Sequence, residues 1–168
     1  MPRRRSAAAL GVQPPQLPDG LPAPSGPVAL FDDAAISGVT LLDADLSGSV
    51  ASDVLIDQVA GRRVRLAQAE LALAQLTDLQ LDSCDLAGAT LTRPQLRRVA
   101  LLGCRLLGLA LLDARIDDLL VQGGNAEALR CWNGTLRAVR FERCALRGAS
   151  FVGSDLSGVI FRDCDLSG

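Results

Sequence analysis

The sequence predicts a repeat solenoid, in which short repeats wind into coils that stack on one another. Its last thirty residues show the repeat most clearly, because residues 139–168 divide into fives as VRFER CALRG ASFVG SDLSG VIFRD CDLSG. The third place of each five is Phe or Leu, and the first place is small or β-branched. A five-residue period fits neither the 3.6-residue period of a helix nor the two-residue period of a strand. A fixed period of this kind is the signature of a repeat architecture.

The five-residue frame extends back from Leu166 to Phe31 without a slip. Of these 28 third places, sixteen are Leu, four are Phe, three are Ile and one is Val. The exceptions are Ala51, Gly61, Ala126 and Cys131. Ala51 and Gly61 are expected to leave thin spots in the core near the N-terminal coils, because both are small.

A longer period, of four fives, relates the repeats to one another. One column of first-place residues is then aliphatic throughout: Val39, Val59, Leu79, Val99, Leu119, Val139 and Val159. A second column contains four of the five cysteines, and its fifth places are mostly Gly, which suits a tight turn. Four fives per coil and 28 fives predict about seven coils, whose inward side chains form continuous columns.

The best copies of the motif resemble the pentapeptide-repeat family, whose repeat is roughly A-(D/N)-L-x-x. They are ADLSG at 44–48, CDLAG at 84–88, SDLSG at 154–158 and CDLSG at 164–168. The resemblance covers residues 29–168. It implies an all-β fold, namely a right-handed quadrilateral parallel β-helix of about seven coils with four fives in each coil.

Residues 1–28 form a separate compositional segment, which contains seven of the eight prolines. Such a segment favours extended chain, and we expect it to be flexible or to cap part of the β-helix. Residues 121–135 keep the five-residue frame, but their residue types depart from those of the other repeats. Two alternatives stay open there: one helical turn from Ala126 to Trp132 that bulges outward, or an ordinary coil with a degenerate sequence.

Composition narrows the classes of function. There is no His, which excludes His-based acid–base catalysis and His-based metal sites. The formal net charge of −2 gives no overall signature of nucleic-acid binding. The most apolar stretch, Leu101 to Leu112, contains Arg105 and is shorter than a membrane span. We therefore expect a protein that binds neither membrane nor nucleic acid directly. Together with the resemblance to pentapeptide-repeat proteins, this leads us to expect a cytoplasmic bacterial protein.

The candidate core residues occupy inward places of the frame. They are Leu86, Leu106, Phe141, Leu146, Phe151, Phe161, Cys84, Cys104, Cys144 and Cys164. The cysteines are separated by whole coils of the frame, one or two at a time, which matches no zinc motif. Adjacent coils would bring pairs of them within disulfide reach, but we expect buried, reduced thiols that fill space.

The second-place carboxylates of Asp45, Asp85, Asp155 and Asp165 are expected to bind turn backbone or solvent. No acid–base pair, nucleophile–base pair or phosphate-binding loop is evident, so we expect no enzyme, no catalytic residue, no cofactor and no metal.

The candidate partner surface consists of outward apolar residues at fourth places. Leu112, Trp132 and Val152 are consecutive in one column, and Leu102 and Leu107 are expected to extend it around a corner. Apolar residues rimmed by polar ones are typical of contact surfaces, and Trp is a common anchor. The last coil is a second candidate, because an uncovered coil exposes strand edges and apolar columns. We expect either a homodimer through that open C-terminal coil or another segment or chain that covers it.

The expected function is that of a non-catalytic protein-interaction or scaffold module with an unidentified protein partner. The alternative comes from the resemblance, since some members of the family mimic DNA, bind DNA gyrase and other type II topoisomerases, and give quinolone resistance. Charge argues against that alternative, because residues 29–168 contain 18 acidic residues and 14 Arg.

Overall fold

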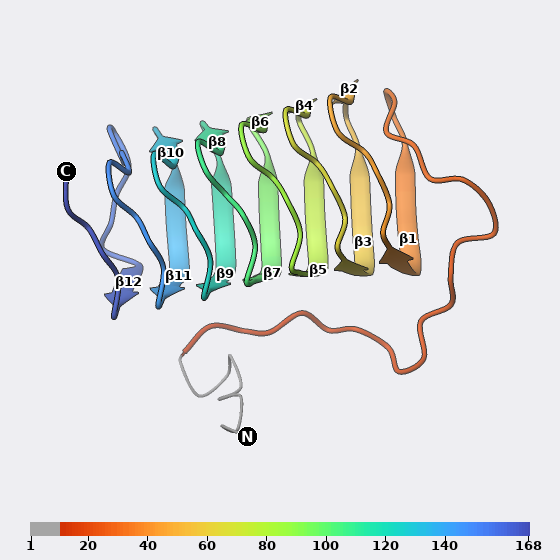
Figure 1. The fold of residues 1–168 in the computed structure, drawn as a ribbon, viewed down its shortest axis with the longest axis horizontal. Helices are drawn as coiled ribbons and strands as arrows, with labels where there is room; N and C mark the ends of the chain where they lie inside the picture. The colour runs from red at the N-terminus through yellow and green to blue at the C-terminus, as the bar shows by residue number, and fades with distance from the viewer. Residues whose placement is uncertain (1–10) are drawn as a thin grey trace.

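The computed structural model describes residues 11–168, and from Ala35 onward the chain forms two parallel sheets wound into a single β-helix (Figure 1). The larger sheet contains, in order, β1 (Ala35–Leu42), β3 (Leu55–Arg62), β5 (Gln75–Asp82), β7 (Gln95–Leu102), β9 (Arg115–Gln122), β11 (Thr135–Glu142) and β12 (Val159–Arg162). The smaller sheet contains β2 (Val50–Ser52), β4 (Glu70–Ala72), β6 (Thr90–Thr92), β8 (Ala110–Leu112) and β10 (Arg130–Trp132).

Each turn of the chain takes four fives, which confirms the predicted coil. Ile36 pairs with Ile56, and Ile56 pairs with Leu76. The same step continues to the last pair, Phe141 with Phe161. The larger sheet has seven strands, so about six turns separate β1 from β12, and the predicted coils correspond to its seven strands.

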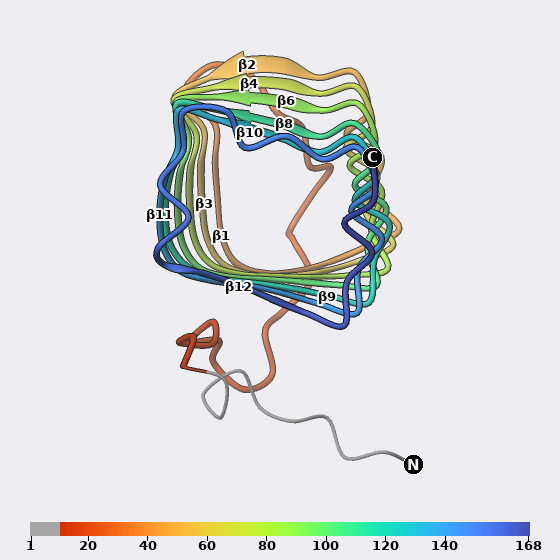
Figure 2. The same ribbon diagram turned by 90° about the vertical axis from the view of Figure 1, so that its left-hand side faces the viewer.

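The β-helix is four-sided in cross-section (Figure 2). Most strands of the larger sheet cover two sides because they bend in the middle, at corners where φ is positive. These corners lie at fifth places of the frame: Gly38, Gln58, Asp78, Arg98, Asp118 and Ala138. A left-handed conformation costs a residue other than Gly about 1 kcal/mol. It persists only where the surrounding structure holds it, as the stacked coils do here.

The core is built from the predicted third-place and first-place side chains. Leu86, Leu106, Leu146 and Phe141 are buried, as are Cys84, Cys104 and Cys144. The core encloses a small cavity of about 60 Å³ that is lined entirely by apolar side chains, among them Leu86, Leu106 and Phe141.

Three predicted core residues are only half-buried, namely Phe151, Phe161 and Cys164. They lie in the last coil, where no further coil of the described chain covers them. Phe161 is covered from one side by Phe141, whose ring stacks on it at a centroid distance of 5.4 Å. Burial in a solenoid depends on the neighbouring coil, so residues at its end keep the frame without its full burial.

The predicted thin spot at Gly61 is wrong. A Cβ atom at Gly61 would lie 2.6 Å from Cδ2 of Leu81, in the next coil, and 3.2 Å from Cγ2 of Val64. These side chains therefore fill the space that the glycine leaves. Ala51 is likewise buried within the core cluster.

Residues 121–135 form an ordinary coil, and the alternative of a bulging helical turn is wrong. β9 ends at Gln122, and β10 begins at Arg130. Between them, Ala126 occupies its third place with 0% exposure. Parallel pairing with β8 and β11 keeps this coil in register despite its unusual composition.

The chain before β1 lies against the β-helix rather than apart from it. Leu30 belongs to the core cluster, and Val28 packs against that cluster. Farther upstream, the chain runs along the outside of the larger sheet toward β9 (Figure 1). Residues 1–10 of the predicted N-terminal segment lie outside the described residues. Within residues 11–168, no helix is long and apolar enough to cross a membrane.

Candidate functional site

The smaller sheet presents an apolar column, which we call the Trp132 wall and define as Leu112, Trp132 and Val152. Trp132 of β10 pairs in register with Leu112 of β8. The next coil continues the column, because the amide of Asn133 donates to the carbonyl of Val152 at 2.9 Å. Trp132 and Val152 are 37% and 66% exposed. Parallel stacking thus places apolar side chains from three successive coils side by side on one flat wall.

Two polar neighbours hold the Trp132 ring. Its indole Nε1 donates a 2.9 Å hydrogen bond to the hydroxyl of Ser150. The guanidinium carbon of Arg130 lies 5.6 Å from the ring centroid, within range of a cation–π interaction. These two contacts therefore hold the ring in one orientation on the surface.

Only part of the predicted extension of this surface is present. Leu107 is exposed, and one corner, which lies at Gly108, separates it from β8. Leu102 lies two corners away, on the larger sheet, where it packs with Val12 and Leu120. Leu102 therefore does not belong to the Trp132 wall. The sequence could not show this, because the frame predicts an outward direction but not what covers the side chain.

The second-place aspartates bind turn backbone, as predicted. The carboxylates of Asp45 and Asp85 accept the amides of Ser47 and Ala87, at 3.1 and 2.9 Å. Asp155 and Asp165 do the same with Ser157 and Ser167. These bonds lower the pKa of Asp45, where the Ser47 side chain contributes most. The aspartates are therefore structural parts of the repeat.

Carboxylates and guanidinium groups also alternate between neighbouring coils. Arg63 binds Asp43 through two hydrogen bonds of 2.6 and 2.9 Å, and lowers the pKa of that carboxyl. Arg65 binds Asp45 at 3.0 Å, two residues farther along each coil. Pairs of this kind neutralise the carboxylates of Asp43 and Asp45 in the N-terminal coils, so these carboxylates do not form an uninterrupted anionic row.

The five cysteines are free thiols, as predicted. The thiols of Cys84, Cys104, Cys144 and Cys164, which stack in one column, each lie within hydrogen-bond range of two carbonyls. One carbonyl belongs to the same coil and the other to the preceding coil. For Cys144 these are Glu142 and Val121, at 3.3 and 3.4 Å. Burial raises the pKa of Cys144, and it raises that of Cys131 to about 11. The Cys84 thiol and burial raise the pKa of Cys104. Such protonated thiols are poor nucleophiles and poor metal ligands.

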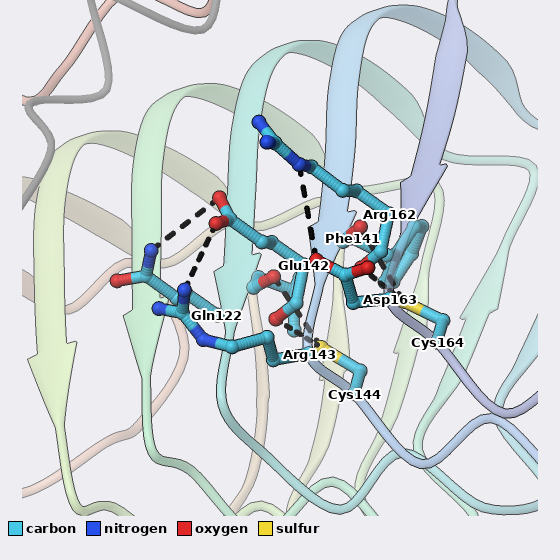
Figure 3. A network of polar contacts seen from close by, with 9 residues as sticks. Gln122, Phe141, Glu142, Arg143, Cys144, Arg162, Asp163 and Cys164 are labelled. Carbon is cyan, nitrogen blue, oxygen red and sulfur yellow. Dashed lines mark hydrogen bonds and ion pairs between the residues drawn. The ribbon is translucent and has the colours of Figure 1, made fainter.

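A polar network that the sequence did not single out lies near the end of β11 (Figure 3). Glu142 is only 3% exposed, although it occupies an outward fourth place. Its carboxylate accepts bonds from Arg143 at 3.1 Å and from Gln122, in the preceding coil, at 3.5 Å. Comparing the fourth places of successive coils would have placed Gln122, Glu142 and Arg162 in one column.

Comparison with known proteins agrees with this architecture. The family model for pentapeptide repeats, which describes eight copies of the repeat, matches residues 135–168. The same frame and the same register between coils continue upstream from there to β1. The chain is a parallel β-solenoid built from five-residue repeats, and residues 135–168 match the pentapeptide-repeat family.

Solved structures similar to this chain include HetL from the cyanobacterium Nostoc sp. strain PCC 7120, a pentapeptide-repeat protein involved in the regulation of heterocyst differentiation. That match has 18% identity and a TM-score of 0.46, over 81% of this chain and 88% of HetL. A trypsin-treated variant of QnrB1, a plasmid-mediated fluoroquinolone resistance protein, has 21% identity and a TM-score of 0.39, over 83% and 75% of the two chains. Rfr23 from the cyanobacterium Cyanothece 51142 has 16% identity and a TM-score of 0.31, over 79% and 88%. No curated protein matches the chain.

Proposed function

We propose that this protein is a non-catalytic interaction module and that the Trp132 wall binds a protein partner. The observation that carries the proposal is the exposed indole of Trp132 between two apolar neighbours, held in place by Ser150 and Arg130. Binding energy at protein interfaces concentrates on such aromatic anchors, where a polar rim excludes water. A partner would present an apolar pocket for the ring and an acceptor for Arg130.

The decisive experiment compares two substitutions on the same wall. Trp132→Asp places a charge on the apolar column, whereas Thr92→Asp places the same charge at the equivalent position two coils earlier. Capture from a lysate of the source organism, followed by mass spectrometry, should recover proteins with wild type and Thr92→Asp that are lost with Trp132→Asp. Equal recovery with all three proteins would contradict the proposal.

A homodimer through the last coil is a second proposal, and a separate observation supports it. That coil exposes Leu156, Ile160 and Leu166, which are 38%, 50% and 53% exposed beside the half-buried ring of Phe161. Analytical ultracentrifugation should show a dimer in the wild type and a monomer after Ile160→Asp. A wild-type monomer at high protein concentration would remove the dimer from the proposal.

The alternative function, a DNA mimic that binds a type II topoisomerase, needs an extended anionic surface. The pairing of Asp43 with Arg63 and of Asp45 with Arg65 works against it. A supercoiling assay with DNA gyrase separates the two functions. Inhibition that survives Trp132→Asp would favour the mimic over the interaction module.

A further inference from the structure

Residues 12–16 of the chain lie on a site that is built on the outside of the larger sheet. We call these residues the strap. The amide of Gln13 donates to the carboxylate of Asp118, and the amide of Gln16 donates to that of Asp78, each at 2.8 Å. Val12 packs with Leu120 and Leu102, and is 3% exposed. Backbone amides and one apolar side chain therefore make the contacts.

The spacing of the strap matches the spacing of the coils. Asp78 and Asp118 occupy equivalent corners of the larger sheet, two coils apart. Two coils advance roughly 9.6 Å at the usual distance between strands. The three residues from Gln13 to Gln16 advance about 9.3 Å as a polyproline II segment, and Pro14 and Pro15 between them favour that conformation. A single polyproline II segment can therefore donate one backbone amide to each of the two carboxylates.

The polar part of the site is held in place by the β-helix itself. Arg98, at the corner between the two aspartates, donates to both oxygens of Asp78 at 2.6 Å. The Asp78 and Arg98 side chains are only 7% and 15% exposed. The acceptor for the Gln16 amide is therefore oriented by a neighbouring coil and does not depend on the strap for its position.

The apolar part of the site is unusual for its place in the frame. Ala100 and Leu120 occupy outward second places of the larger sheet, yet both are 4% exposed. Leu102, at an outward fourth place, is half-buried beside them. Leucines at outward places of neighbouring strands form an apolar seat that water would otherwise contact, and Val12 covers it.

We propose that this corner is a docking site for an extended, proline-containing peptide of a partner protein, and that the strap covers it in cis until such a peptide displaces it. Recognition requires an apolar residue at the seat and two backbone amides three residues apart, with prolines between them. The strap itself is held by few contacts, since Gln13 and Gln16 are exposed and Pro14 and Pro15 are half-buried. When a partner peptide displaces the strap, its backbone amides replace those of Gln13 and Gln16 as donors to the same two carboxylates. The stacked coils therefore stay unchanged. This proposal is independent of the Trp132 wall.

The test uses the full-length protein and a fluorescent peptide with the sequence of residues 11–20. A release variant carries Val12→Asp, Gln13→Pro and Gln16→Pro, which remove the apolar contact and both amide donors while keeping the extended conformation. Fluorescence anisotropy should give a Kd at least about tenfold lower for the release variant than for wild type, because the covalently attached strap competes at high effective concentration. Circular dichroism and cooperative unfolding check that the release variant is folded. Val12→Asp alone serves as a second, milder release variant.

Two matched controls address the chemistry of recognition. A peptide that carries proline at the positions of Gln13 and Gln16 has the same shape but no donors, and it should bind at least about tenfold more weakly. Asp118→Asn in the release variant should weaken binding, whereas Asp117→Asn, which alters the neighbouring carboxylate, should not.

Three results would overturn the proposal. They are equal binding of both peptides, equal binding to wild type and release variant, and no binding at millimolar peptide. A wild-type dimer that Val12→Asp converts to a monomer would show that the strap of a second copy fills the site, and would overturn the assignment in cis.

Discussion

The carboxylate of Asp78 and the guanidinium of Arg98 form two 2.6 Å hydrogen bonds at adjacent corners of the larger sheet. The two residues lie one coil apart, on neighbouring strands. The pair joins β5 to β7 at a bend where both residues adopt positive φ. It also orients the carboxylate that accepts the Gln16 amide. One ion pair thus contributes to the stability of the corner and to the site that the strap occupies.

Asp78→Asn should destabilise the protein by about 3 kcal/mol, because removal of one partner from a buried pair leaves the other charge without compensation. Urea unfolding at pH 7 measures the change. Asp43→Asn is the matched control, since Asp43 pairs with Arg63 in the same geometry but in solvent. It should change stability far less. Equal losses would show that burial of the Asp78 pair has no energetic consequence.

The contribution of Asp78 should decline in acid. Arg98 lowers the pKa of Asp78 below its ordinary value of 3.8, and the Gln16 amide and Arg97 lower it further. A carboxyl group whose pKa is lowered on folding stabilises the protein above its unfolded-state pKa and loses that effect as the pH falls through the folded-state pKa. The difference in unfolding free energy between wild type and Asp78→Asn should therefore be constant above about pH 5 and decline as the pH falls below the ordinary value of 3.8. A difference that stayed constant between pH 5 and about pH 2 would contradict this.

Gly61→Leu should destabilise the protein by about 1–3 kcal/mol, although it restores the commonest residue of the repeat. The new side chain would occupy the space that Cδ2 of Leu81 now fills. Leu81→Ala alone should also be destabilising, because it opens a cavity. The double variant should recover part of both losses, and a double-mutant cycle measures that coupling. Strict additivity would mean that the two positions do not share one space.

Cys164 should react first with a thiol reagent in the native protein. It is the one half-buried cysteine, on the last described coil, whereas the other four are buried. Burial also raises the pKa of Cys131 and Cys144, which lowers the fraction of reactive thiolate. Mass spectrometry after brief labelling should find the modification on Cys164, and all five should react in denaturant. Early labelling of Cys84 or Cys104 would indicate that the middle coils open more readily than the end.

The repeat allowed much of the fold of this protein to be predicted from the sequence. A coil of four fives places equivalent residues on top of one another, so the columns of Val39 and Cys84, and the pairing of Leu112 with Trp132, follow from counting alone. The Asp45 turn is local and follows from residue type in the same way.

Tertiary structure decided the contacts that the frame does not encode. Leu81 fills the space left by Gly61 because a side chain can extend into the neighbouring coil, and the frame records only whether a residue points inward. Val12 covers Leu102 and Leu120 because a chain outside the repeat folds back across it, although these residues are far apart in sequence. Periodicity determines which residues stack within the solenoid, whereas burial on its outer surface depends on a segment that has no period.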